Sequence, residues 1–350
     1  MSRTRAVLWS SAGTLAGFAG WLTTSAYRRD LGAARARVAA GSSIADTRHG
    51  PVEYALAGNG APVLMVHGAG GGYDQGLDIG EPLIKKGFRL IAVSRFGYLR
   101  TPLPKDASAE AQADAHASLL DVLGISRVAV VGVSAGAPST MQFALRYPDR
   151  CAALVLLSPA LYVPREGGTP FLKRPRWTAA LFDTALRSDF LFWLAMRTSR
   201  SLMIRSVLGT LPEIVDSASA AERAKVATTL EHILPVAPRR LGLLNDAEVV
   251  SSLDSYEPRD VKVPVLAISM ADDIYGTLDG ARYAAEHIPG ACFLGYSDGG
   301  HLCVGHTDAI ISAIAEFFAS HQVQQPYPIQ RSGSQAAAMM IRSPAAKEKP

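Results

Sequence analysis

Cysteine is scarce in this sequence, with three residues in a chain of 350. Cys151, Cys292 and Cys303 are odd in number and widely spaced, so they provide neither a disulfide framework nor a C-x-x-C metal-binding pattern. Charged residues make up only 19% of the chain, and the net charge is +4. Because the lysines and arginines are spread out, several of them in the terminal segments outside the expected folded domain, we expect no nucleic-acid partner.

The sequence also lacks phosphate-binding templates and solenoid-type repeats. Its glycine-rich segment at residues 67–72 fits neither G-x-G-x-x-G nor G-x-x-x-x-G-K-[ST], so we expect no nucleotide site there. Hydrophobic residues, in contrast, make up 48% of the chain, which is ample for a large core. The length allows one large domain with an insertion or two modest domains.

Short apolar runs alternate with longer helical patterns through much of the chain. We expect strands at residues 51–56, 62–66, 88–93, 127–133, 151–157, 264–269 and 291–296, and a helix at 109–123. Strands that alternate with helices require crossover connections, so the fold class is α/β with a mainly parallel central sheet flanked by helices.

Composition divides the chain into five segments. Residues 161–255 are rich in leucine, alanine, arginine and aromatics, contain several prolines and lack strand-like runs. This pattern predicts an inserted helical cap over the carboxyl edge of the sheet, where open α/β folds bind ligands. The expected segments are a hydrophobic N-terminal segment (1–30), the two parts of the core (31–160 and 256–321), the cap (161–255) and a disordered tail (322–350).

Residues 6–27 are uncharged and flanked by arginines. As a helix they would cover about 30 Å, enough for a bilayer core, so they predict a membrane anchor. The downstream arginines, including Arg28 and Arg29, favour a cytoplasmic catalytic domain. Two alternatives are export after cleavage of a signal peptide near Ser25–Ala26 and a soluble leader.

The segment Gly132-Val133-Ser134-Ala135-Gly136 follows a β-branched run and precedes a helical pattern. A serine at such a strand-to-helix turn is held in a strained conformation with its hydroxyl above the sheet, and flanking glycines avoid clashes with neighbouring elements. The start of the helix also favours developing negative charge. This context indicates that Ser134 is a nucleophile.

A serine hydroxyl needs a base and a group that orients the base. His301 follows an expected strand and two glycines, so we expect it to be the base, with His306 as its rival. Asp272 and Asp273 follow the strand at 264–269, and only one of two adjacent carboxylates is expected to point inward. We favour Asp273 as the orienting acid, with Asp272 as the alternative.

The reaction also needs N–H donors for an oxyanion. We expect these from the backbone of Ala135, directly after the nucleophile, and of Ala69 in the glycine-rich segment. His67, in the same segment, is interpreted as a packing residue rather than a catalytic group.

Taken together, these motifs resemble the capped α/β-hydrolase superfamily over roughly residues 45–320. The chain departs from the usual pattern at Met270 and Gly276 in the acid loop and at residues 99–101. The matching motifs, in chain order, are His67-Gly68, Ser94-Arg95-Phe96-Gly97-Tyr98, the Gly132–Gly136 elbow, Asp272-Asp273 and Gly300-His301.

The resemblance implies a cofactor-free, metal-free serine hydrolase of the carboxylic ester type with a small-molecule acyl substrate. A serine at position 134 argues against the dehalogenases and epoxide hydrolases of this superfamily, which use a carboxylate nucleophile. The alternatives are an acyltransferase or perhydrolase with the same triad, and a non-catalytic binding protein. Six cap aromatics are candidates for an acyl pocket, or for the core of the cap: Phe171, Trp177, Phe182, Phe190, Phe192 and Trp193.

Overall fold

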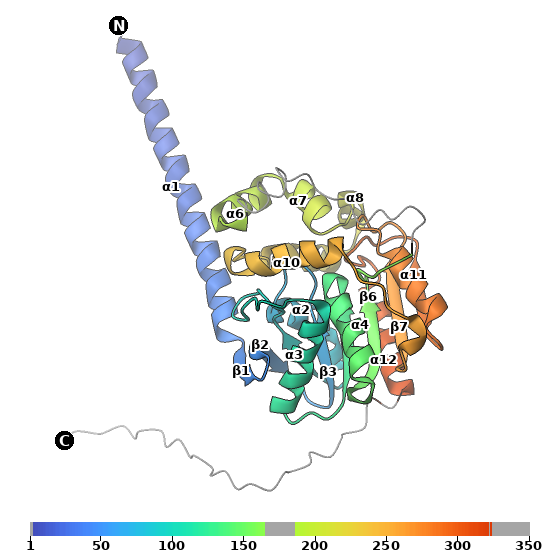
Figure 1. The fold of residues 1–350 in the computed structure, drawn as a ribbon. Coiled ribbons are helices and arrows are strands. Elements are labelled where there is room, and N and C mark those ends of the chain that lie inside the picture. The colour runs from blue at the N-terminus through green and yellow to red at the C-terminus, as the bar shows by residue number, and fades with distance from the viewer. Residues whose placement is uncertain (1–2, 165–185, 322, 324–350) are drawn as a thin grey trace, which may run out of the picture.

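The computed structural model describes residues 3–164, 186–321 and 323 of the chain. One eight-stranded sheet runs through the molecule in the order β1-β2-β4-β3-β5-β6-β7-β8 (Figure 1). β2 pairs antiparallel with β1 and β4, and the remaining pairs are parallel. The strands are β1 (Ser43–Thr47), β2 (Gly50–Ala57), β3 (Ala61–Val66), β4 (Phe88–Val93), β5 (Val128–Val133), β6 (Cys151–Leu157), β7 (Val265–Met270) and β8 (Cys292–Tyr296).

The expected mainly parallel α/β sheet is therefore confirmed, and seven of its strands lie where the sequence predicts them. The eighth, β1, was not predicted. It is only five residues long and mostly exposed at the edge of the sheet, with Ala45 its one buried residue, so it has no apolar run to reveal it.

Helices cover both faces of the sheet. Alternate residues of β3 enter different layers, since Leu64 and Val66 pack with α3, α4 and α11 while Val63 and Met65 pack with α2 and α12. These helices are α2 (Tyr73–Lys85), α3 (Ala109–Val122), α4 (Ala137–Arg146), α11 (Leu278–His287) and α12 (Thr307–Ser320). Because both faces are covered, the central strands are almost continuously apolar.

Between β6 and β7 the described residues form a layer of helices at one edge of the sheet (Figure 1). Its buried cluster includes Trp193, Leu230 and Ile233. Phe171, Trp177, Phe182 and the expected tail, apart from Val323, lie outside the described residues. The helices are α6 (Asp189–Thr198), α7 (Arg200–Val207), α8 (Pro212–Ser217), α9 (Ala220–Glu231), η3 (Ala237–Arg239) and α10 (Arg240–Ser251); short turns η2 (Pro148–Arg150) and η4 (Pro258–Asp260) lie outside this layer.

The expected membrane anchor is wrong. Residues 6–27 do lie in a long helix, α1 (Arg3–Ala40), whose first half extends away from the body (Figure 1). Within the described part of the chain, however, no helix is both long and apolar enough to span a bilayer. The length suffices, but repeated serine, threonine and glycine lower the hydropathy of the segment. The expectation that the catalytic domain lies on the cytoplasmic side of a membrane depended on that anchor, so it is wrong as well.

The second half of α1 packs against the rest of the molecule. Asp30 accepts a hydrogen bond from Nε1 of Trp193 at 2.9 Å, and Nη2 of Arg37 donates to the carbonyl of Leu234 at 2.6 Å. The Tyr73 hydroxyl in turn donates to the carbonyl of Arg37 at 3.2 Å. Part of α1, including Asp30 at the end of the expected N-terminal segment, thus belongs to the fold.

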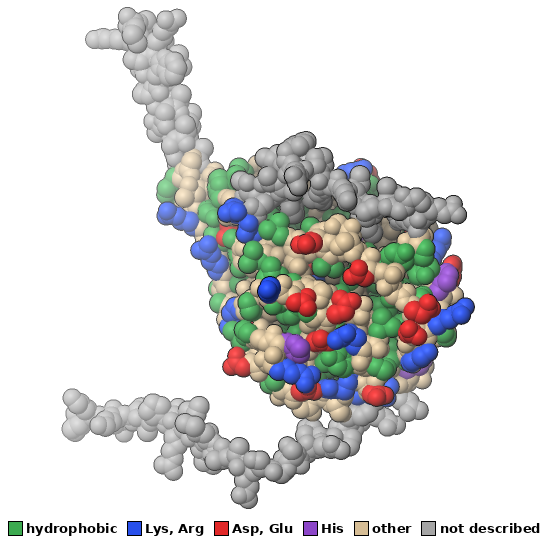
Figure 2. Space-filling model, viewed as in Figure 1, with side chains coloured by type: hydrophobic (Ala, Val, Ile, Leu, Met, Phe, Trp, Pro, Cys, Tyr) green, Lys and Arg blue, Asp and Glu red, His purple; other side chains and the backbone are tan. Residues whose placement is uncertain are grey.

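Charged side chains of both signs intermingle on the face drawn in Figure 2. Blue and red groups alternate there with hydrophobic and polar ones. Over the described residues of this face, the basic side chains therefore do not form one continuous positive surface of the kind that binds the phosphate backbone of a nucleic acid.

Candidate active site

Ser134 sits at a strained turn between β5 and α4. It begins the short turn η1 (Ser134–Gly136) with φ of +50°, a conformation that is costly for a residue with a side chain. A Cβ on Gly132 would lie 2.1 Å from Oγ1 of Thr140, and one on Gly136 would lie 2.7 Å from the carbonyl of Val66. Both glycines are therefore required by close neighbours on α4 and β3, as the motif predicts.

His301 lies next to this serine. Its Nε2 is 2.8 Å from Oγ of Ser134, and its Nδ1 is 2.8 Å from Oδ2 of Asp273. Asp273 follows β7 and His301 follows β8, so the parallel strands deliver all three side chains to one edge of the sheet. The structure thus brings together the serine, histidine and aspartate that the sequence singled out.

Asp273 is held as a carboxylate in a shielded position. It accepts hydrogen bonds from N–H of Tyr275 at 2.9 Å and from the hydroxyl of Thr277. Burial by itself raises the pKa of Asp273, but the hydrogen bond and charge of His301 and these other donors lower it, and the net pKa lies below 3.8. An ionised carboxylate here holds Nδ1–H of His301, which leaves Nε2 free to accept a proton.

Asp272 points elsewhere. Its carboxylate accepts from N–H of Gly299 at 3.2 Å and of Gly300 at 2.8 Å, the two residues before His301. The adjacent aspartates therefore have different partners: Asp273 contacts the imidazole, and Asp272 holds the turn that carries it.

Gly68, next to one of the two expected oxyanion donors, packs against the serine. A Cβ on Gly68 would lie 3.0 Å from Cβ of Ser134 and 3.7 Å from its Oγ. The N–H of Ala135 belongs to the first turn of a helical segment, where no intrahelical acceptor exists. The carbonyl of Ser134, in the same peptide unit, accepts from N–H of Ala160 at 3.1 Å, which fixes that unit in place.

The other two histidines considered in the sequence have structural surroundings. His306 lies at the start of α12, with Nε2 2.8 Å from Oδ1 of Asp298. His67 is fully buried, accepts from N–H of Arg95 through Nε2 and bonds the carbonyl of Gly68 through Nδ1. Burial, and then the positive charge of Arg95, hold the pKa of His67 well below 6.5, so its ring is neutral.

One cap turn that sequence reasoning missed contacts both loops of the site. The carbonyl of Gly209 accepts from N–H of Ile274 at 3.2 Å and from N–H of His301 at 3.3 Å. Oγ1 of Thr210 accepts from N–H of Leu302 at 3.3 Å. The signal in the sequence is only a glycine after a helix, which is also the ordinary sign of a helix end.

The cap aromatics that the structure describes pack mainly with each other. Trp193 is buried and stacks on Phe190 at 6.0 Å between ring centroids, and Tyr27 of α1 meets both rings edge-on. Phe192 packs against the same cluster. Trp193 and Phe192 therefore form part of the core of the cap, whereas Phe190 is 37% exposed.

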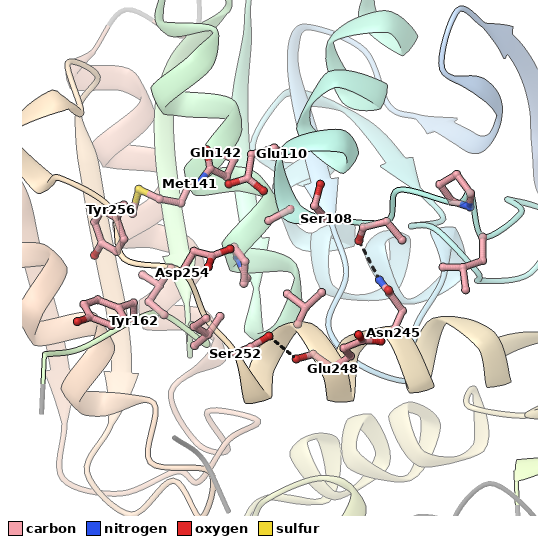
Figure 3. A pocket seen from close by; sticks show the side chains of 18 of the residues that line it. Ser108, Glu110, Met141, Gln142, Tyr162, Asn245, Glu248, Ser252, Asp254 and Tyr256 are labelled. Atoms are coloured by element: carbon pink, nitrogen blue, oxygen red, sulfur yellow. Dashed lines mark hydrogen bonds between the residues drawn. The ribbon is translucent and has the colours of Figure 1, made fainter. Parts of the chain in front are cut away.

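A cavity of about 400 Å³ lies between α10 and the starts of α3 and α4 (Figure 3). Its wall includes Glu110, Met141, Tyr162 and Asn245, and Asn245 donates to the carbonyl of Ala107 at 3.2 Å. None of Ser134, Asp273 and His301 lines this cavity, so it is separate from the candidate active site. Within the described residues, no group of three His, Cys, Asp or Glu is arranged to hold a metal ion.

Comparison with known proteins agrees with the fold. The family model described as alpha/beta hydrolase fold matches residues 61–304. An uncharacterised hydrolase of Bacillus subtilis strain 168, YcgS, is 28% identical over 267 residues, which cover 72% of this chain and 89% of the relative.

Two further similarities concern a named activity and a solved structure. The 2-hydroxy-6-oxononadienedioate/2-hydroxy-6-oxononatrienedioate hydrolase of Comamonas testosteroni is 26% identical over 272 residues, covering 75% of this chain and 90% of that protein. The structure of an alpha/beta hydrolase fold protein from Nakamurella multipartita superposes with a TM-score of 0.65 at 28% identity, covering 79% of this chain and 98% of that one.

Proposed function

The chain belongs to the alpha/beta hydrolase fold family, and we propose that it is a serine hydrolase that cleaves a carboxylic ester or a related acyl bond through an acyl-enzyme. That it is a hydrolase follows from the family and from the relatives. The proposal adds which residues carry out the reaction and which kind of bond is cleaved. One observation carries it: an unbroken chain of hydrogen bonds from Oγ of Ser134 through His301 to Oδ2 of Asp273, each of 2.8 Å.

In the proposed reaction, Oγ of Ser134 attacks the acyl carbonyl carbon while Nε2 of His301 takes the hydroxyl proton. The negative charge that develops on the carbonyl oxygen is stabilised by the N–H groups of Ala69 and Ala135. When the tetrahedral intermediate collapses, the alcohol leaves with the proton from His301 and the acyl group stays on Ser134. A water molecule that gives its proton to His301 then releases the carboxylic acid.

Asp273 would act on the base rather than on the substrate. Its carboxylate holds the Nδ1–H of His301 and stabilises the imidazolium that forms when Nε2 takes the proton. Because the pKa of Asp273 lies below its ordinary value, this carboxylate stays ionised through the neutral pH range.

A panel of substrates tests the proposal. We expect purified protein to hydrolyse p-nitrophenyl esters of at least one acyl length between acetate and decanoate, and Ser134→Ala to lose this turnover. Ser217→Ala is the matched control, since the hydroxyl of Ser217 donates to the carbonyl of Ile214 in its own helix. Retention of turnover in Ser134→Ala would remove the assignment of the nucleophile.

The same panel separates related reactions. The Comamonas relative is named as a hydrolase of a dienedioate, so a 2-hydroxy-6-oxo-dienoate belongs among the substrates, together with simple lactones. Added alcohol or hydrogen peroxide identifies an acyltransferase or perhydrolase, since the acyl group then leaves as a new ester or a peracid. Release of free acid alone supports the hydrolase.

A further inference from the structure

A buried ion pair joins cap helix α10 to the loop after β4. The guanidinium of Arg95 binds the carboxylate of Asp246 through two parallel hydrogen bonds of 2.6 Å. Both side chains are nearly inaccessible, at 7% and 6% exposure. Bidentate pairs of this kind combine charge with fixed geometry, so the position of Asp246 on α10 determines where the guanidinium lies.

The same guanidinium holds the two backbone segments beside Ser134. Nη2 of Arg95 donates to the carbonyl of Gly68 at 3.2 Å, and Nη1 donates to the carbonyl of Ala135 at 3.1 Å. His67 adds a third contact, because the Nδ1–H of its neutral ring donates to the carbonyl of Gly68 at 2.7 Å.

The contact with Gly68 fixes the direction of a neighbouring donor. In a trans peptide the C=O of Gly68 and the N–H of Ala69 point in opposite directions. Donors that hold the carbonyl on one side therefore turn the N–H of Ala69 to the other side of the peptide. A hydrogen bond from a cation also polarises the peptide unit, which makes its N–H a stronger donor.

Tyr98 completes the arrangement. Its hydroxyl donates to Oδ2 of Asp246 at 2.5 Å and accepts from N–H of Gly70 at 3.2 Å. Its ring is fully buried and meets His67 edge-on, with 4.7 Å between centroids. The carboxylate of Asp246 is thus connected to Gly68 through Arg95 and to Gly70 through Tyr98, on both sides of Ala69.

We propose that Arg95, Tyr98 and Asp246 are positioning residues for the oxyanion hole, so that cap helix α10 holds the N–H of Ala69 in its reactive orientation. This inference rests on the proposed serine-hydrolase function. Because the oxyanion exists only in the transition state and the tetrahedral intermediate, loss of the arrangement lowers kcat and leaves KM nearly unchanged.

The test separates positioning from mere attachment of the cap. Asp246→Asn alone leaves Arg95 buried without its counter-charge and invites misfolding, whereas Arg95→Met with Asp246→Leu replaces both charges by apolar groups of similar volume. The matched control is Arg146→Met with Asp114→Leu, another bidentate pair, which joins α4 to α3. Tyr98→Phe removes one hydroxyl only.

We expect the Arg95/Asp246 double variant to fold, with a lower unfolding temperature because Tyr98 and the carbonyls of Gly68 and Ala135 each lose a partner, and with kcat for a p-nitrophenyl ester lowered about 100-fold. KM should change less than about twofold, and Tyr98→Phe should lower kcat severalfold. A trifluoromethyl ketone, which forms a tetrahedral adduct with an oxyanion, should lose affinity by about the same factor as kcat in each variant. The control pair should retain full kcat and inhibitor affinity.

Two results would overturn the proposal: a folded double variant with wild-type kcat, or a loss confined to KM with unchanged affinity for the ketone. Either result leaves the serine-hydrolase function standing. If the serine-hydrolase proposal itself is wrong, the wild-type protein will lack Ser134-dependent turnover. That result would also remove the positioning role, and it is distinguishable from the two results above.

Discussion

The sheet and the cap contribute to the site in different ways. The three side chains assigned to the chemistry, Ser134, Asp273 and His301, each follow a strand of the sheet and meet at one edge. The cap supplies contacts to the loops around them: the carbonyl of Gly209 accepts from the N–H groups of Ile274 and His301, and the carboxylate of Asp246 binds the side chain of Arg95. The sheet therefore brings the reactive groups together, and the cap restrains the loops around them.

This difference has a consequence for mutation. Removal of a group at the sheet edge should abolish a chemical step, whereas removal of a cap contact should leave every reactive group present but less well oriented. The predictions below run from the first kind of effect to the second.

The largest effect is expected for His301→Ala, which removes the proposed base. Turnover of a p-nitrophenyl ester should fall about 10⁴-fold or more, because the serine then keeps its proton. His306→Ala is the matched control and should keep kcat within about twofold. His306 lies at the start of α12, where its ring bonds Asp298 rather than Ser134 or Asp273. Comparable losses in the two variants would contradict the assignment.

The adjacent aspartates offer a sharper contrast. Asp273→Asn should lower kcat about 10³-fold, because an amide can donate to Nδ1 of His301 and favour the wrong tautomer. Asp272→Asn should cost less than about tenfold, because its remaining oxygen still accepts from one of the two N–H groups before His301. Steady-state kinetics of both variants decides the matter, and a larger loss in Asp272→Asn would reverse the roles given to the two carboxylates.

Asp74 on α2 should affect stability. It pairs with Arg239 of the cap layer at 2.7 Å and with Arg37 of α1. Burial raises the pKa of Asp74, but the two arginines outweigh burial and lower it from 3.8 to about 2. Asp74→Asn leaves the fully buried Arg239 without its counter-charge, so it should lower the free energy of unfolding by about 3 kcal/mol or more at pH 7.

The pH dependence of this loss has a definite sign. Since the pKa of Asp74 is depressed in the folded state, its contribution is complete above about pH 4 and declines as the pH falls toward 2. Urea unfolding at pH 7 and pH 3 should show a smaller difference between variant and wild type at pH 3. Asp78→Asn, on the same helix and paired with His232 at the surface, should change the free energy by less than about 0.5 kcal/mol. A difference that grows in acid would contradict the ion-pair explanation.

The smallest effect is expected at the cap turn. Thr210→Val keeps the volume but leaves the N–H of Leu302 without its acceptor. We expect a loss of about 1 kcal/mol in the free energy of unfolding and a threefold decrease or so in kcat, with KM unchanged. Thr210→Ser should restore both values. A change in KM alone would show that this turn acts on substrate binding rather than on the loop that carries His301.

The sheet could be predicted closely because its signals are local. A buried parallel strand is an apolar run, and the residues after β5, β7 and β8 carry the serine, the aspartates and the histidine. The choice between Asp272 and Asp273 could not be made with certainty from sequence, because neighbours on a loop differ only in where each side chain points. The strand β1 was missed because an exposed edge strand needs no apolar run.

The contacts of the cap have no comparable signal. Asp246 lies on a helix that otherwise looks ordinary in sequence, and its partner Arg95 is 151 residues away. Arg37 was not singled out in the sequence, yet it reaches Asp74 and the cap carbonyls because α1 continues past the apolar stretch to Ala40. Long-range polar contacts depend on the finished fold, so composition and periodicity do not reveal them.

Covalent labelling tests the central claim most directly. A fluorophosphonate phosphorylates an activated serine in a hydrolase, and peptide mass spectrometry identifies the modified residue. We predict a single adduct on Ser134, absent from Ser134→Ala and formed much more slowly in His301→Ala. An adduct that forms equally well on the Ser134→Ala protein would contradict the account.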